Sequence, residues 1–215
     1  MDALCAEILS TCNWDNDDFV QDYHLLMGTI MAAKSPLSSS SLRSLHRNNP
    51  TLEIDGVLRP LSSLLTGVFE DNQPIQILHL SFRDLITGHA QSSIIYQRFH
   101  FSEEEQDQRL AILCLRVFSE DLTSNTPGAG YLTGLMPDIE GIPSVDKSHI
   151  SGVLCYACRS WTEHIIEIEG PASATLLDSL RMFLVAKLTL WMEVLNTQHT
   201  FQSLTKIRSW LQAGD

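Results

Sequence analysis

Apolar residues recur every three or four positions along most of this chain, and this spacing constrains the fold more than any other feature. It is typical of amphipathic helices. It is interrupted at Ser35-Pro36 and at Gly170-Pro171, because proline pushes the preceding residue out of the α region. Residues 123–147, rich in glycine and proline, predict a long irregular connection. The predicted helices are one beginning near residue 19, others over about 53–65, 103–119, 148–167, 173–196 and 200–212, and short ones after the serine run 38–41 and after Ser81. Pro60 predicts a kink or a break within 53–65.

One short part of the chain departs from the helical spacing. Two β-like runs, at 66–69 and 74–79, flank the polar residues 70–73, which favour a turn. Three helices followed by a hairpin is the element order of a winged helix. The sequence therefore predicts a mainly α fold, a winged helix (three helices plus a short β-hairpin) followed by an all-helical domain. The predicted boundaries are 1–19 for an N-terminal segment, 20–98 for the winged helix and 99–215 for the helical domain.

Polar side chains predict where several helices begin. The acidic stretch at 13–18 is expected to form a loop or an N-cap before the helix that starts near Phe19. The hydroxyls of residues 38–41 can cap the next helix. Ser102 and Glu105 have the spacing of a capping box, in which a hydroxyl and a carboxylate satisfy two backbone N–H groups.

The charge of the chain argues against several classes of partner. Its 215 residues include 14 lysines and arginines against 26 aspartates and glutamates, which gives a formal net charge of −12. This acidic excess repels phosphate backbones and anionic lipids, so it argues against nucleic-acid and membrane-surface binding. The longest apolar stretches fall short of the roughly 18 residues that a spanning helix needs. Asp2 and Glu7 stand where a signal peptide carries positive charge, so we expect a cytoplasmic protein.

Five cysteines, an odd number, favour free thiols in a reducing compartment. Cys155 and Cys158 form a C-x-x-C pair, but a structural zinc site needs four ligands and no second pair lies at suitable spacing. The pair falls within a helical apolar pattern, which favours two ordinary buried or half-buried cysteines. Metal-binding and redox roles remain the alternatives.

No sequence motif indicates catalysis. The chain lacks G-x-x-x-x-G-K-[ST], whose backbone amides and lysine hold nucleotide phosphates, and it lacks G-x-S-x-G and H-E-x-x-H. We therefore expect no catalytic residue, no metal site and no enzyme activity. A small enzyme whose groups converge from distant positions is one alternative.

A stand-alone winged-helix DNA-binding regulator is the other alternative. The cationic candidates on the second and third predicted helices are Arg43, His46, Arg47 and Arg59. Glu70 and Asp71 lie at the predicted tip of the wing, where they would face phosphate with the wrong sign. The sequence therefore favours a winged helix that packs against protein.

Two motifs resemble a known family. The stretch 58–65, Leu-Arg-Pro-Leu-Ser-Ser-Leu-Leu, and the stretch 77–86, Ile-Leu-His-Leu-Ser-Phe-Arg-Asp-Leu-Ile, look like the winged-helix region of fungal NACHT-type STAND NTPases that carry WD repeats. Residues 156–164 and 183–195 resemble helical stretches of the same NLR-like family. Together the matches extend from about 25 to 195, in the family's order.

This resemblance implies a role in signal transduction. In the family the winged helix packs over the nucleotide-binding domain, and the histidine of the L-H-x-S-F motif approaches the β-phosphate of ADP. His79 occupies the matching position. The implied partners are a NACHT domain, which would hold ADP or ATP, and a WD-repeat sensor. The implied function is a non-catalytic regulatory and interaction segment that couples nucleotide state to the sensor and to oligomerisation.

The chain also departs from the family pattern. It contains neither the Walker motifs nor WD repeats, and Leu85-Ile86 and Ser160 replace residues that include aromatics in the family. Phe82, Leu85 and Trp161 are expected in the core. Arg159 and His164 are expected to be exposed or to lie between domains.

Overall fold

The computed structural model describes residues 2–87, 99–123, 129–132, 145–198 and 202–213. In these residues the protein is mainly helical, with one small two-stranded antiparallel sheet, so the prediction of a mainly α fold is confirmed. The chain divides into two compact units, unit 1 (Met1–Gln106) and unit 2 (Asp107–Asp215). The predicted boundaries at 19/20 and 98/99 stay predictions.

No helix in the described ranges has the length and hydropathy that crossing a bilayer requires.

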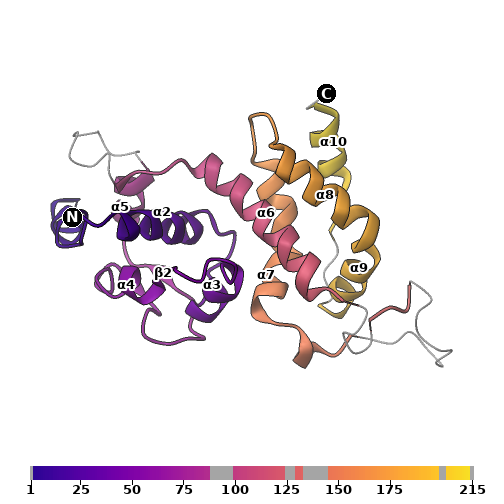
Figure 1. Cartoon of the computed structure of the whole chain (residues 1–215), viewed down its shortest axis with the longest axis horizontal. Helices are drawn as coiled ribbons and strands as arrows, with labels where there is room; N and C mark the ends of the chain where they lie inside the picture. Colours follow the sequence, from indigo (N-terminus) through magenta and orange to yellow (C-terminus); the bar gives the residue numbers. More distant parts are fainter. Residues whose placement is uncertain (1, 88–98, 124–128, 133–144, 199–201, 214–215) are drawn as a thin grey trace. The chain divides into compact units, whose positions relative to one another are not determined.

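Unit 1 contains both strands and the helices that precede and directly follow them (Figure 1). They are α1 (Asp2–Ser10), α2 (Asp17–Ala32), α3 (Ser39–Leu45), α4 (Ile54–Leu58), β1 (Leu65–Thr66), β2 (Gln76–Ile77) and α5 (Leu80–Thr87). Helix α6 (Glu103–Asp121) begins in unit 1 and continues into unit 2. The apolar spacing did not predict α1.

Local capping explains several helix starts. The Asn16 side chain accepts hydrogen bonds from the backbone N–H of Asp18 and of Phe19, at 2.9 and 3.2 Å. The Ser38 hydroxyl accepts one from Ser41 N–H at 3.2 Å. These contacts satisfy donors that the first helical turn leaves unpaired. The predicted caps at 13–18 and 38–41 are confirmed, as is the expected start of α2 near residue 19. At the predicted capping box, the Ser102 hydroxyl accepts a hydrogen bond from Glu105 N–H at 3.4 Å, which confirms the hydroxyl half of that motif.

The predicted helix over 53–65 is only partly correct, because α4 ends at Leu58. Pro60 supplies no N–H group to continue the ladder. Residues 59–64 instead form turns, with bonds such as Leu61 N–H to Leu58 O and Leu64 N–H to Leu61 O. The predicted break of the helix at Pro60 is therefore confirmed, and no second helix follows it before β1.

The predicted hairpin is present, with strands much shorter than expected. Leu65 pairs with Ile77 and Thr66 with Gln76 in an antiparallel register. Gly67 has φ +73°, and a Cβ atom there would collide with the Pro74 carbonyl oxygen. Glycine is suited to this position because it lacks that atom. An isolated bridge between Ser38 and Pro74 adds the segment before α3 to the same sheet edge.

The core of unit 1 is a cluster of aromatic and aliphatic side chains. Trp14 lies edge-on to Tyr23 with ring centroids 4.8 Å apart, and its ring is 4.6 Å from that of Phe99. On α5, the side chains of Phe82 and Ile86 are fully buried. The core prediction for Phe82 and Leu85 is thus confirmed.

Unit 2 is helical throughout its described elements (Figure 1). Those after α6 are η2 (Lys147–His149), α7 (Gly152–Ile166), α8 (Ala174–Ala186), α9 (Leu188–Thr197) and α10 (Thr205–Ala213). The predicted helix over 173–196 is broken at Lys187, whose φ of −126° and ψ of −9° leave the α region. The Lys187 ammonium donates to Leu122 O at 2.7 Å, which holds this corner in place.

Four aromatic rings form the centre of unit 2. Trp161 is fully buried, and its ring lies 4.8 Å from Phe183 and 5.7 Å from Trp191. The Phe118 ring stacks on Phe183 at 4.8 Å. The Trp191 indole N–H donates to Cys158 O at 3.2 Å, so this large side chain is buried with its hydrogen bond satisfied. Trp161 is a core residue, as predicted.

Candidate functional site

His79 lies at the junction between β2 and α5, where its side chain is exposed. Leu78 N–H donates to Leu64 O at 2.9 Å, which continues the pairing of the hairpin by one residue. Phe82 N–H then bonds to His79 O at 3.1 Å as the chain enters the helix. Helix α5 begins at Leu80, earlier than predicted, so His79 directly precedes it.

The two neighbours of His79 are large apolar residues that face solvent. Leu78 is 48% exposed and Leu80 is 72% exposed. The opposite face of α5 is already filled by Phe82 and Ile86, so Leu80 has no access to the core of unit 1. We call residues 78–80 the junction stretch. It combines an imidazole, which donates and accepts hydrogen bonds, with apolar surface on both sides.

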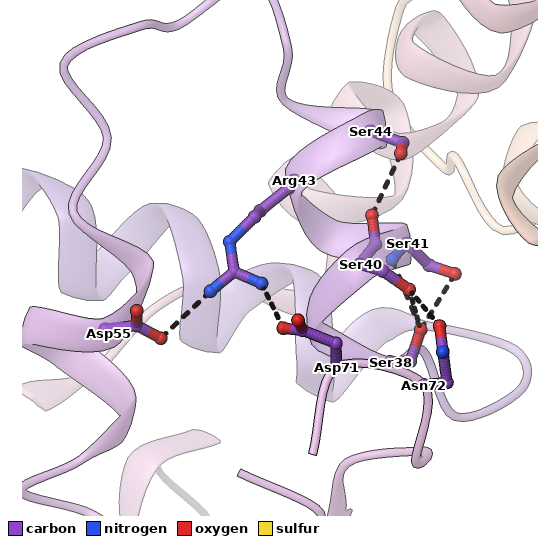
Figure 2. A network of polar contacts seen from close by, with 8 residues as sticks. All are labelled: Ser38, Ser40, Ser41, Arg43, Ser44, Asp55, Asp71 and Asn72. Atoms are coloured by element: carbon purple, nitrogen blue, oxygen red, sulfur yellow. Dashed lines mark hydrogen bonds and ion pairs between the residues drawn. The ribbon is translucent and has the colours of Figure 1, made fainter. Parts of the chain in front are cut away.

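A polar network holds the hairpin turn next to the two preceding helices. Figure 2 shows Arg43 reaching from α3 to Asp55 on α4 and to Asp71 in the turn, with N–O distances of 3.0 and 2.7 Å. The turn is also attached through its backbone, since Ser40 N–H donates to Asp71 O at 2.9 Å. The Ser40 hydroxyl donates to Asn72 Oδ1 at 3.2 Å. The turn is therefore fixed to α3 at several points.

This network bears on the DNA-binding alternative. Arg43, one of the four cationic candidates, faces two carboxylates that offset its charge. His46 is only 6% exposed, and its Nε2 lies 3.1 Å from the Thr29 hydroxyl. Arg47 and Arg59 are exposed. Because Arg43 is paired with two carboxylates and His46 is buried, the arrangement counts against phosphate binding by this face.

The prediction that His164 is exposed or interdomain is wrong. His164 is fully buried within unit 2, with Nδ1 2.5 Å from Asp107 Oδ1 and Nε2 2.7 Å from the Tyr156 hydroxyl. Tyr156, Ser160 and His164 follow one another at four-residue intervals on α7 and share a buried face. Burial is tolerated because both ring nitrogens have partners. Arg159 is exposed, as expected, and donates to Gln198 Oε1 at 2.8 Å.

Asp107, His164 and Tyr156 form a continuous hydrogen-bonded series, which we call the buried triad. An Nδ1–H that donates to the carboxylate leaves Nε2 to accept the phenol O–H, and this tautomer satisfies both contacts. The triad fastens α6 to α7, and Tyr156 and Asp107 are only 5% and 6% exposed. With so little exposure of any member, the geometry supports a structural role. Asp107 lies 57 positions from His164, so no local sequence pattern signals the pair.

The C-x-x-C pair behaves as predicted. Cys155 is half-buried and Cys158 is buried, and both thiols are free on α7. Burial raises the pKa of both thiols, which disfavours the reactive thiolate form. Among the described residues, no group of three histidine, cysteine or acidic side chains is placed to hold a metal ion.

Comparisons with models of known protein families, with curated proteins and with solved structures find no match for this chain. The likeness to NACHT proteins therefore rests on the motifs alone. The structure brings one of those motifs, at 77–86, to the β2–α5 junction with His79 exposed.

Proposed function

We propose that this chain is a non-catalytic regulatory segment of a NACHT-type STAND signalling protein, with a winged helix in unit 1. The element order α2, α3, α4, β1, β2 supports this fold. So does the bridge between Ser38 and Pro74, because a winged helix sets a short strand between its first two helices against the hairpin. The segment would couple nucleotide state to a WD-repeat sensor and to oligomerisation, without catalysis of its own.

The junction stretch carries this proposal. Exposing Leu78 and Leu80 on either side of a histidine costs free energy in water, unless a partner covers them. A NACHT nucleotide-binding domain is the partner that the motif implies. Docked there, the two leucines would supply apolar contact, and His79 would reach toward the bound nucleotide.

The chemistry of the junction stretch fits a phosphate group. The His79 imidazole can donate a hydrogen bond to a phosphate oxygen. The first residues of α5 come directly after it, and the positive end of a helix dipole attracts an anion. ADP that contacts both domains favours the state in which they touch, and removal of that contact releases the segment.

Binding between this chain and a separately purified NACHT domain tests the proposal. Isothermal titration calorimetry should show the ADP-loaded domain binding about tenfold more tightly than the ATP-loaded domain. Leu80→Asp should abolish binding, because it places a charge in an apolar contact. Leu177→Asp is the matched control, since Leu177 is 43% exposed on α8 in unit 2.

Two results would contradict the proposal. One is equal binding to the ADP-loaded and ATP-loaded domains, or none to either. The other is micromolar affinity of the isolated chain for ADP, because such a chain would carry a nucleotide site of its own.

A further inference from the structure

Unit 1 contains a groove whose lining does not include residues of the junction stretch. It has a volume of about 730 Å³ and lies between the α1–α2 connection, the first half of α2 and the segment 49–60. All of its lining residues belong to unit 1. The groove is therefore a feature of this unit alone, and its chemistry is independent of the proposed function.

The walls of the groove carry charge of one sign. Asp18, Asp22 and Glu53 line it, and among the residues that the structure describes no lysine, arginine or histidine belongs to the lining. Asp22 is held in place because its Oδ2 accepts the backbone N–H of Glu53 at 2.9 Å, which joins α2 to the start of α4. Glu53 makes no side-chain capping bond to α4. Carboxylates gathered in a concave site concentrate the field there and favour a cation.

The rest of the lining is suited to the stem of a long cationic side chain. Phe19 and Leu25, which are half-buried, and Pro60, which is exposed, contribute apolar surface. The Phe19 ring is positioned by an edge-on contact with Trp14, with centroids 5.5 Å apart. Lysine and arginine bury their methylene groups on such surfaces while the charged end reaches acidic groups. The combination fits a basic side chain better than a bare metal ion, which needs no apolar wall.

Gly56 leaves one wall of the groove open. A Cβ atom added there would meet only the Glu53 Cβ, at 3.4 Å, so a larger side chain has room to extend. Gly56 lies within α4, where most residues are better helix formers than glycine. Substitution at this position should therefore fill the groove without unfolding the protein.

We infer that this groove binds a peptide segment of a protein partner in which lysine or arginine alternates with apolar residues. Charge complementarity selects the basic residue, and the apolar lining selects its neighbours. The groove thus gives unit 1 a second interaction site, separate from residues 78–80.

The test uses the full chain and a fluorescent peptide in which leucine alternates with lysine. Fluorescence anisotropy should show saturable binding that weakens with added salt. The double variant Asp18→Asn/Glu53→Gln should lower affinity at least roughly tenfold, as should Gly56→Leu. Asp22 is left unchanged because its carboxylate holds α4.

Controls separate this site from general attraction to an acidic protein. The double variant Glu163→Gln/Asp178→Asn removes the same charge from exposed positions in unit 2 and should bind normally. A peptide with glutamate in place of lysine should not bind. Equal reduction of affinity in the two double variants, or full affinity in Gly56→Leu, would overturn the inference. Spermidine that binds as tightly as the peptide, with the same dependence on Asp18 and Glu53, would overturn the assignment to a peptide.

Discussion

Two polar networks of three residues each show how differently the same chemistry behaves at the surface and in the interior. Arg43, Asp55 and Asp71 in unit 1 have side chains that are 43%, 50% and 73% exposed. In the buried triad of unit 2, the side chains of His164 and Asp107 are 0% and 9% exposed. Water can take the place of any side chain removed from the first network. It cannot reach the second, so a polar group that loses a hydrogen bond there gains no water in exchange.

This difference decides what each network contributes. Exposed ion pairs add about 0–1 kcal/mol, because solvent screens them and two long side chains must be ordered. A buried charged group whose partner is removed costs ~3–5 kcal/mol. The surface network therefore positions the hairpin turn, whereas the buried triad supports the fold of unit 2. Three predictions test this contrast between the networks and one compares the two cysteines of α7, in order from the largest expected effect to the smallest.

Breaking the buried triad at its centre should have the largest effect. His164→Leu leaves the Asp107 carboxylate buried without its imidazole partner, so we expect the free energy of unfolding to fall by ~3–5 kcal/mol. Urea denaturation monitored by circular dichroism measures this decrease. The double variant Asp107→Leu/His164→Leu should recover part of it, because both polar groups are gone. A decrease below about 1 kcal/mol in the single variant would show that the triad behaves like a surface pair.

The two cysteines of α7 should differ in reactivity. The buried Cys158 thiol should react at least about a hundredfold more slowly than half-buried Cys155 with a thiol reagent, because it must wait for local opening. Burial also raises the pKa of Cys158, which lowers its thiolate fraction. Single Cys→Ser variants assign each rate. Similar native-state rates for the two thiols would mean that this part of unit 2 is open to solvent.

Removing the outer hydrogen bond of the buried triad should cost less. Tyr156→Phe keeps the ring but takes away the phenol that faces His164 Nε2 at 2.7 Å. Loss of this hydrogen bond in the protein interior should lower the free energy of unfolding by ~1–2 kcal/mol. Tyr131→Phe is the control, since Tyr131 is 42% exposed. Equal stability of Tyr156→Phe and the wild type would exclude this bond from the energetics of the fold.

The surface network should show the smallest effect. Arg43→Ala is expected to lower the free energy of unfolding by no more than about 1 kcal/mol, and added salt should shrink the difference. Hydrogen exchange at Ser40 N–H, which bonds to Asp71 O, should nevertheless become faster as the turn loosens. A decrease in stability as large as that of His164→Leu would remove the contrast between the two networks.

Short-range features of the fold could be predicted from the sequence. The caps at Asn16 and Ser38 depend on residues two or three positions away, so the pattern and the contact coincide. The break at Pro60 is explained by its missing donor. The predicted strands are longer than the observed ones, because the β-like sequence pattern extends beyond the two residue pairs of the antiparallel ladder. No local sequence feature indicated the break at Lys187, whose ammonium donates to a carbonyl 65 positions away.

Features that depend on distant residues could not be predicted. His164 was predicted to be exposed because histidine is polar and nothing near it in the sequence identifies Asp107 as its partner. Asp107 sits in an acidic helix start, where a carboxylate usually faces water. The exposure of Leu80 was equally hidden, since an apolar residue in a helical pattern normally faces the core. His79 was singled out by its motif, and its role stays a prediction.

The rate of ADP release tests the proposed role of unit 1 most directly. A chain with a NACHT nucleotide-binding domain placed before this segment would be loaded with fluorescent ADP and chased with unlabelled nucleotide. His79→Ala should speed release roughly tenfold, the change expected when one charge-assisted hydrogen bond is removed. His149→Ala, which changes an exposed histidine in unit 2, should leave the rate unchanged. Equal release from wild type and His79→Ala would contradict the proposal that unit 1 holds the nucleotide in place.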